Sequence, residues 1–131
     1  MSKSFEEVME RFRAITFKEN FDLIVAIANG GIIPAAILNQ RLELEMHLLK
    51  INLRDANQNP KYDSPVLLAP IDFPYQGKRI LLVEDRVKTG ASLNFAKTLL
   101  KEAALIKTFA VNGNADYALY NESCFRFPWI A

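Results

Sequence analysis

Residues 79–93, Arg-Ile-Leu-Leu-Val-Glu-Asp-Arg-Val-Lys-Thr-Gly-Ala-Ser-Leu, restrict the fold of this chain more than any other stretch. Residues 80–83 form an unbroken apolar run, which is typical of a parallel strand buried on both faces. Glu84 and Asp85 come at the end of this run, and a small hydroxyl-rich loop follows them. Apolar residues then recur at helical spacing, which predicts a helix to about residue 102. The stretch therefore predicts a strand, two acids, a loop and a helix.

The loop after the acids suits a phosphate group. The first backbone amides of a helix lack internal partners, and they lie at the positive end of the helix dipole. Thr89 and Ser92 add hydroxyl donors, and Gly90 lets the backbone approach an anion closely. Ionised carboxylates only accept hydrogen bonds, so Glu84 and Asp85 suit ribose hydroxyls or the water shell of a magnesium ion. The alternative is an ordinary strand-to-helix turn of an α/β protein.

A second loop of similar design occurs earlier in the chain. Residues 21–28 predict the first buried parallel strand, and Asn29, Gly30 and Gly31 end it. A helix is predicted to follow, because Pro34 is tolerated in a first helical turn. A glycine turn between a strand and a helix can form a nest for anions. It is neither a dinucleotide fingerprint nor a Walker loop, and by itself it is equally compatible with a simple tight turn.

The other predicted elements complete an α/β pattern. A capping box at residues 4–7 begins an N-terminal helix, and further strands are predicted at residues 46–53, 65–69 and 105–111. Alternating strands and helices favour right-handed crossovers and a mostly parallel sheet flanked by helices. Ligands of such sheets lie beyond the carboxyl ends of the strands, so both loops are expected at the same edge.

Composition restricts the compartment and the partners. A chain of 131 residues is about one domain, so residues 1–131 are expected to form a single unit. The formal charge of +1 gives no overall attraction to nucleic acid or to an anionic membrane. The single cysteine, Cys124, excludes an intrachain disulfide, and no apolar run approaches the roughly 20 residues of a membrane helix. We therefore expect a cytoplasmic protein without nucleic-acid or membrane partners.

The run Val-Glu-Asp-Arg-Val-Lys-Thr-Gly-Ala-Ser resembles the phosphoribosyl-pyrophosphate signature of the type I phosphoribosyltransferases. The resemblance extends over residues 21–129 and is nearest to the xanthine/guanine/hypoxanthine (purine) members. It implies transfer of the 5-phosphoribosyl group from phosphoribosyl pyrophosphate to a nitrogenous base, expected to be a 6-oxopurine, with release of pyrophosphate. It also implies a requirement for Mg²⁺ and assembly into a homodimer or a higher homo-oligomer.

The resemblance assigns a role to each loop. The residues implied to hold the 5-phosphate are Lys88, Thr89, Gly90, Ala91 and Ser92. Those implied to hold the pyrophosphate, through backbone amides, are Asn29, Gly30 and Gly31. Glu84 and Asp85 would hold the ribose hydroxyls and, through these or through water, the metal. The implied catalytic residues are Glu84, Asp85 and Lys88.

A polar segment at residues 54–75 is rich in Asn, Asp and Pro. The resemblance implies that it is a flexible loop that closes over the active site and excludes water. Arg54, Lys61 and Tyr62 are its candidates for reaching the substrates, although solvated loop residues are an equally good interpretation.

The tail, residues 112–131, is too short and irregular for another strand–helix crossover and is rich in aromatic residues. The resemblance implies that it forms a small C-terminal hood over the base. Phe125 and Trp129 are then the candidates to stack on the base, because stacking needs only an aromatic face. Closure of the core or of a dimer interface is the alternative role for these rings.

Two positions depart from the pattern of the 6-oxopurine relatives. Lys88 stands where many relatives have an aspartate implied to contact the base, and a charged lysine cannot accept a hydrogen bond. The lysine that often reads the purine oxygen from the last strand is replaced by the Ala-Val-Asn of residues 110–112. One hypothesis is that Lys88 itself supplies the missing cationic donor to the base. A non-catalytic sensor of phosphoribosyl pyrophosphate or of a nucleotide, with the same fold, therefore remains an alternative function, and transfer to a non-purine acceptor is a second.

Overall fold

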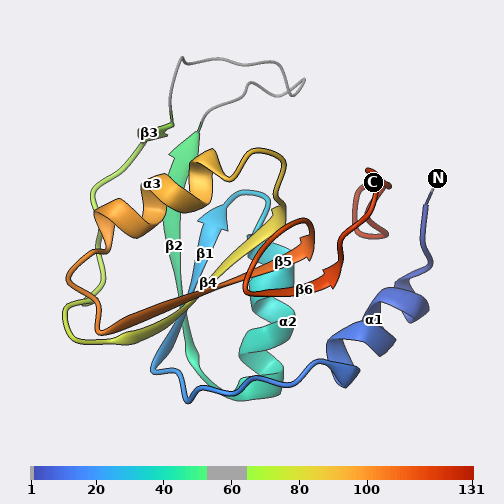
Figure 1. Ribbon diagram of the computed structural model, residues 1–131, viewed down its shortest axis with the longest axis horizontal. Helices are drawn as coiled ribbons and strands as arrows, with labels where there is room; N and C mark the ends of the chain where they lie inside the picture. The colour runs from blue at the N-terminus through green and yellow to red at the C-terminus, as the bar shows by residue number, and fades with distance from the viewer. Residues whose placement is uncertain (1, 53–64) are drawn as a thin grey trace.

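The computed structural model describes residues 2–52 and 65–131, and Figure 1 shows their arrangement. The elements are, in chain order, α1 (Phe5–Ala14), β1 (Leu23–Ala28), α2 (Ile32–Leu42), β2 (Glu45–Asn52), β3 (Val66–Leu67), β4 (Arg79–Arg86), α3 (Ala91–Leu99), β5 (Leu105–Asn112) and β6 (Tyr117–Tyr120). None of the helices in this described part of the chain combines the length and the apolar character needed to cross a bilayer.

The strands form one sheet in the order β3-β2-β1-β4-β5-β6. Every neighbouring pair is parallel except β2 and β3, which confirms the predicted mostly parallel α/β sheet. After β1 the chain adds β2 on one side, and it later adds β4 on the other side of β1. Such a switch point leaves a crevice at the carboxyl ends of the two strands, because their following loops turn to opposite faces.

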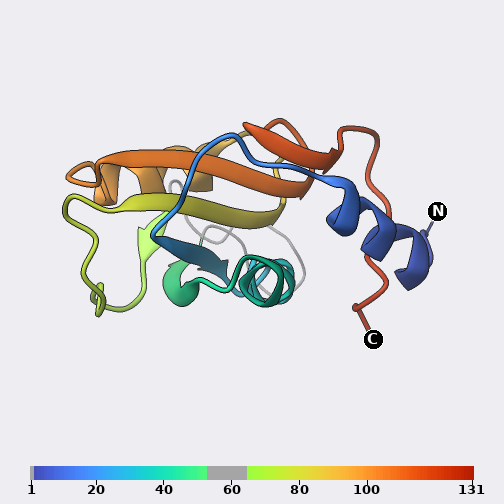
Figure 2. The same ribbon diagram turned by 90° about the horizontal axis from the view of Figure 1, so that it is seen from below.

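The two faces of the sheet bury separate cores because successive side chains of a strand point to opposite sides. Leu81 and Val83 of β4 pack in a cluster with residues of α1 and α2. Ile80 and Leu82 alternate with these two residues along β4, and they pack in a second cluster with residues of α3. Helices therefore cover both faces of β4, as a continuous apolar strand requires (Figure 2).

The tail contains a strand that the sequence pattern did not predict. β6 lies parallel to β5, with Phe109 opposite Tyr117, although parallel neighbours usually need a long crossover. Here residues 113–116 alone connect the end of β5 to the start of β6. A carboxylate oxygen of Asp116 holds this connection against β5 by accepting hydrogen bonds from the backbone N–H and the hydroxyl of Thr108, at 2.8 and 3.0 Å. The predicted hood of residues 112–131 is therefore in part an edge of the sheet, and only residues 121–131 continue beyond it.

The other boundaries differ slightly from the sequence prediction. The strand predicted at residues 80–83 extends over Arg79–Arg86, so both acids belong to the strand itself. The helix expected to reach residue 102 ends at Leu99. The predicted cap of α1 is confirmed, since the Ser4 hydroxyl accepts a hydrogen bond from the backbone N–H of Glu7 at 3.0 Å.

Candidate active site

A cleft of about 440 Å³ opens at the carboxyl ends of β1 and β4, at the switch point of the sheet. Four parts of the chain line it: residues 27–30 at the end of β1 and just after it, Ile51 and Asn52 of β2, residues 84–93 from β4 into α3, and Arg126, Phe127 and Ile130 of the tail. The two loops singled out in the sequence thus meet in one cavity.

Glu84 and Asp85 line the cleft from the C-terminal end of β4. The Glu84 carboxylate accepts a hydrogen bond from the backbone N–H of Asp85 at 3.1 Å, and Asp85 accepts one from the N–H of Arg86 at 2.6 Å. Burial, and then the negative charge of Asp85, raises the pKa of Glu84 well above its usual range. An adjacent pair of carboxyl groups, one of them with a raised pKa, suits neutral hydroxyls or a cation as partners.

The glycine loop after β1 is packed directly on this acid pair. The peptide bond between Ala28 and Asn29 is cis, and Asn29 and Gly30 line the cleft. A methyl group built on Gly30 would lie 2.6 Å from a carboxylate oxygen of Asp85, so a side chain at this position would displace that carboxylate. Gly31 is buried and does not line the cleft, since its Cα faces the carbonyl oxygen of Val83, 2.3 Å from a built methyl group.

The loop before α3 has the geometry expected of an anion site. Gly90 adopts a left-handed conformation, with φ +83°, at the start of α3, and the Thr89 hydroxyl accepts a hydrogen bond from the Ala91 N–H at 3.2 Å. Residues 88–92 all line the cleft, so the N-terminal end of α3, the positive end of its dipole, lies at the cleft. Lys88 is exposed and adds a positive charge to the rim.

The aromatic residues of the tail are arranged differently from the expectation. Phe125 is 4% exposed and packs at 5.1 Å from the Tyr120 ring, inside the core and not on the cleft wall. Trp129 is half-buried and stacks on Phe127 at 5.1 Å, also away from the lining. Phe127 is the aromatic residue of the tail that reaches the cleft.

Arg86 is a cleft residue that the sequence interpretation missed. Its Nη2 donates a hydrogen bond to the carbonyl oxygen of Phe125 at 2.7 Å, and its guanidinium carbon lies 4.6 Å from the centre of the Phe127 ring. The sequence contained this information, because side chains two residues apart in a strand point to the same face of the sheet. Arg86 therefore lies on the same face as Glu84. Arg126, beside Phe127, was missed as well, and its contribution depends on the path of the tail, which no local pattern shows.

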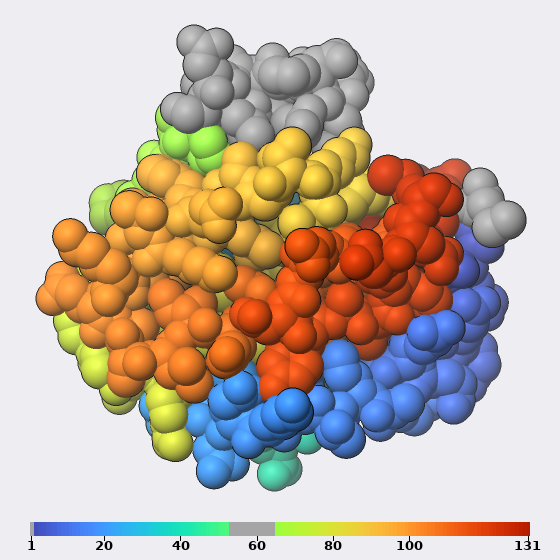
Figure 3. Space-filling model, in the orientation of Figure 1, coloured from blue at the N-terminus to red at the C-terminus, as the bar shows by residue number. Residues whose placement is uncertain are grey.

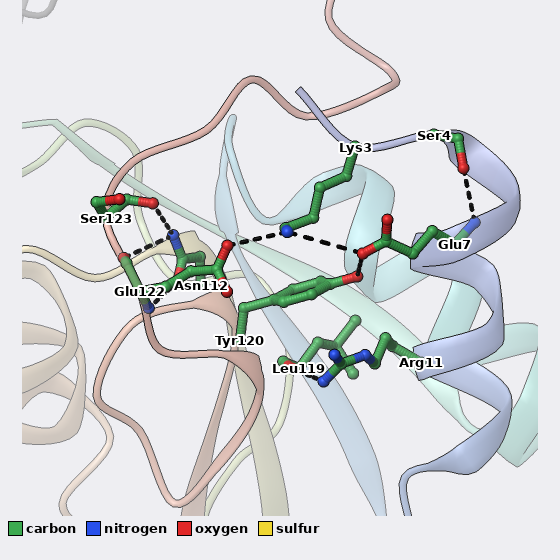
Figure 4. Close-up of polar contacts among 9 residues, drawn as sticks. All are labelled: Lys3, Ser4, Glu7, Arg11, Asn112, Leu119, Tyr120, Glu122 and Ser123. Atoms are coloured by element: carbon green, nitrogen blue, oxygen red, sulfur yellow. Dashed lines mark hydrogen bonds and ion pairs between the residues drawn. The ribbon is translucent and has the colours of Figure 1, made fainter. Parts of the chain in front are cut away.

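The tail is fixed by contacts with the N-terminal segment and with β5 (Figure 3, Figure 4). Lys3 lies between Glu122, at 2.9 Å, and Glu7, at 3.7 Å, and its Nζ is 4.7 Å from the centre of the Tyr120 ring. The buried Asn112 amide donates to the backbone carbonyls of Glu122 and Ser123, at 3.2 and 3.4 Å. In Figure 3 the red C-terminal surface accordingly adjoins both the blue N-terminal segment and the yellow surface after β4.

Two further expectations concern the metal and the loop. In residues 2–52 and 65–131, no three His, Cys, Asp or Glu side chains gather as a ligand set for a metal. Glu84 and Asp85 are the cleft carboxylates, and a cation there would need most of its ligands from substrate or water. The predicted loop residues Arg54, Lys61 and Tyr62 lie outside the described residues.

Comparison with known proteins agrees with this geometry. Residues 3–120 match the phosphoribosyl transferase domain family. The chain is 22% identical over 136 residues to a xanthine-guanine phosphoribosyltransferase of Idiomarina loihiensis, which covers 96% of this chain and 84% of that protein. It is 32% identical over 119 residues to one of Desulfotalea psychrophila, covering 86% and 72%. The fold superposes with a TM-score of 0.81 on a crystal structure of a purine phosphoribosyltransferase from Pyrococcus horikoshii, at 24% identity, covering 98% and 92%. The chain therefore belongs to the type I phosphoribosyltransferase family and is an enzyme of that family.

Proposed function

We propose that this enzyme transfers the 5-phosphoribosyl group from phosphoribosyl pyrophosphate to a 6-oxopurine and releases pyrophosphate. The observation that carries this proposal is the contact between the loop after β1 and the acid pair of β4, in which Gly30 packs on the carboxylate of Asp85. Two groups of backbone amides thus flank one pair of acids in a single cleft. A ribose with a phosphate at each end has this distribution of charge and hydroxyl groups.

Each part of the cleft has a partner in the donor. We propose that the loop of Lys88, Thr89, Gly90, Ala91 and Ser92 holds the 5-phosphate, because the N-terminal end of a helix, hydroxyl groups and a cation all favour an anion. Glu84 and Asp85 accept hydrogen bonds from the ribose hydroxyls. The backbone of Asn29 and Gly30 holds the pyrophosphate, while Gly31 keeps that loop against β4.

Magnesium fits the donor set of this cleft. Mg²⁺ keeps several waters and is bound through one or two carboxylates together with phosphate oxygens, so two acids are enough on the protein side. We propose that Glu84 and Asp85 hold it through the ribose hydroxyls or through water. When bound, Mg²⁺ neutralises charge on the departing pyrophosphate.

The reaction replaces the bond between the ribose C1′ and a pyrophosphate oxygen by a bond between C1′ and a ring nitrogen of the base. The proton that this nitrogen loses passes to the released pyrophosphate or to water. Positive charge develops on the ribose as the first bond breaks. The carboxylates of Glu84 and Asp85 stabilise that charge, and the two loops hold the ends of the donor in line with the base. Lys88 is a candidate contact to the base as well as to the phosphate.

A 6-oxopurine is proposed as the acceptor because the relatives described above carry the names of xanthine-guanine and purine phosphoribosyltransferases. The base would lie beside Phe127, the tail ring that reaches the cleft. Phe125 and Trp129 would contribute by packing against that ring, at 5.4 and 5.1 Å. Residues 121–131 would then act as the hood.

The test is release of pyrophosphate from phosphoribosyl pyrophosphate and Mg²⁺ with a panel of hypoxanthine, guanine, xanthine, adenine and uracil. We expect release with at least one 6-oxopurine and a large loss in Asp85→Asn. Release with adenine or uracil alone would overturn the assigned base. Tight binding of the donor without release on any base would instead favour the non-catalytic sensor.

We also propose that the enzyme is a homodimer or a larger homo-oligomer. Ile33 on α2 is 41% exposed and Phe5 on α1 is 52% exposed, and large apolar side chains on a surface are candidates for burial by a second copy. Light scattering coupled to size-exclusion chromatography should give at least twice the mass of one chain. A mass equal to one chain at assay concentration would contradict this.

A further inference from the structure

The Phe127 ring has almost no open surface, although it is the aromatic residue of the tail that lines the cleft. Phe127 is 2% exposed. The Trp129 ring stacks on it at 5.1 Å, the Phe125 ring meets it edge-on at 5.4 Å, and the Arg86 guanidinium lies 4.6 Å from its centre. A planar base therefore cannot lie directly on this ring while these three neighbours stay in place.

Arg86 is the only one of these three neighbours that also lines the cleft. The surface that covers Phe127 on the cleft side is thus a guanidinium group. This group is planar and can itself stack on a base, which an ammonium group cannot do. The cleft therefore offers a cationic plane, backed by two aromatic rings, where an exposed aromatic face was expected.

The Arg86 guanidinium is held in place from two directions. Its backbone is fixed at the end of β4 opposite Asn112 of β5, and its Nη2 donates to the carbonyl oxygen of Phe125 at 2.7 Å. Its Nε is buried and lacks a hydrogen-bond partner among residues 2–52 and 65–131. A side chain fixed at both ends and wedged over a ring is suited to be a permanent wall of the site.

We propose that Arg86 is the residue that contacts the base, with the base stacked on its guanidinium plane and Phe127 and Trp129 supporting that plane from behind. This inference rests on the proposed phosphoribosyl transfer and names the acceptor side of the same site. Arg86 follows Glu84 on the same face of β4, so a base on this plane lies next to the carboxylates that bind the ribose. A cationic plane attracts the electron-rich face of an oxo-substituted base.

The first experiment compares Arg86→Leu and Arg86→Lys with the wild type in steady-state kinetics on the full chain. Arg13→Leu is the matched control, because Arg13 is an exposed arginine of α1 whose partners are Glu6 and Glu10. We expect both Arg86 variants to raise KM for the base about tenfold, the change expected from losing one stacking contact, with KM for phosphoribosyl pyrophosphate unchanged. Lysine should not rescue, since it keeps the charge and loses the plane.

Two results would overturn the proposal. KM for the base equal to that of the wild type in both Arg86 variants would show that the base does not use this plane. A lower KM in Arg86→Leu would show that the guanidinium blocks the Phe127 ring and must leave for the base to bind. Thermal melting of each variant checks that residues 121–131 still pack.

A second readout does not depend on turnover. Trp129 is the only tryptophan and stacks on Phe127, so its fluorescence reports on this stack. Titration with guanosine or inosine monophosphate and Mg²⁺, without pyrophosphate so that no reaction can occur, should change the emission of the wild type and of Arg13→Leu, with about tenfold weaker binding in both Arg86 variants. Unchanged affinities would refute the role of Arg86 and leave phosphoribosyl transfer standing. Absence of turnover in the wild type would refute the transfer, while the titration would still decide the contact.

Discussion

Gly30 and Asp85 are packed so closely that a methyl group on Gly30 would lie 2.6 Å from a carboxylate oxygen of Asp85. This contact joins the loop after β1 to the acid pair at the end of β4. The side chain of Asp85 can move, but the movement would take its carboxylate away from the proposed ribose site. The neighbouring Gly31 differs, because its built methyl group meets the backbone carbonyl of Val83 at 2.3 Å.

The two glycines should therefore give separable phenotypes. Gly30→Ala is expected to lower kcat/KM about 100-fold through displacement of Asp85, with a small change in Tm. Gly31→Ala should destabilise the fold by about 1–3 kcal/mol, since strand backbone must shift. Gly77→Ala is a control for stability alone, because Gly77 has φ +69° in open space just before β4, while the cleft lies at the opposite end of that strand. Gly30→Ala with wild-type kcat/KM would show that this contact does not position Asp85.

Glu84→Gln should lower the activity and raise the thermal stability of the enzyme. Burial and the charge of Asp85 raise the pKa of Glu84 above its ordinary 4.5 in the folded protein. The folded state then holds a proton that the unfolded state has lost, so the free energy of unfolding falls as pH rises from about 4.5 through the raised pKa. Glutamine does not ionise and removes that loss.

We expect a Tm near pH 7 that is a few degrees higher in Glu84→Gln, with roughly 4 °C for each kcal/mol gained, and no difference from the wild type below about pH 4. Activity should fall at least about tenfold, because an amide is a weaker acceptor for ribose hydroxyls and metal-bound water. Melting curves from pH 4 to 8 give the first result. Parallel Tm profiles of the two proteins would show that Glu84 carries no electrostatic cost.

The loops and the parallel sheet were predictable because their signals are local. Residues 80–83 form an apolar run that ends in two acids, and residues 29–31 end another run in glycines, so each strand end could be found from its own neighbours. The sheet topology then placed both loops in one cleft. The contact between Gly30 and Asp85 explains why a residue without a side chain is needed there, which the sequence alone did not show.

The tail was less predictable because distant contacts determine its path. β6 follows β5 through a short connection that depends on the bonds of Asp116 to Thr108, a pairing that no periodicity reveals. Phe125 and Phe127 are equivalent in the sequence, and the choice between core and cleft follows from where Asn112 and Arg86 hold the backbone. Local sequence signals therefore indicated the phosphate side of the site more directly than the base side.

Lys88 is expected to serve the donor. It is exposed on the cleft wall, and a charge-assisted hydrogen bond to a phosphate contributes about 1.5–3 kcal/mol. Lys88→Ala should therefore lower kcat/KM for phosphoribosyl pyrophosphate by about 10–100-fold, and Lys88→Arg should retain most of it. Improved use of a purine by Lys88→Asp, together with unchanged activity in Lys88→Ala, would refute a contact between Lys88 and the base.

Asn112 should control the base site through the backbone of the tail. Its side chain is 2% exposed, accepts a hydrogen bond from the Glu122 N–H at 3.0 Å and donates to the carbonyls of Glu122 and Ser123. Asn112→Asp keeps the shape and one acceptor but sets a second oxygen against those carbonyls. We expect a loss of about 1–3 kcal/mol in the free energy of unfolding, measured by urea denaturation.

The kinetic consequence separates positioning from general stability. Loosening residues 122–127 displaces Phe127 and the carbonyl that holds Arg86, so Asn112→Asp should raise KM for the base and leave KM for phosphoribosyl pyrophosphate unchanged. Lys3→Met is the comparison, because Lys3 binds the same segment from outside through Glu122 and should have a smaller effect of the same kind. An equal rise in both KM values would mean that Asn112 supports the whole sheet edge, and that the tail is not a separately positioned wall of the base site.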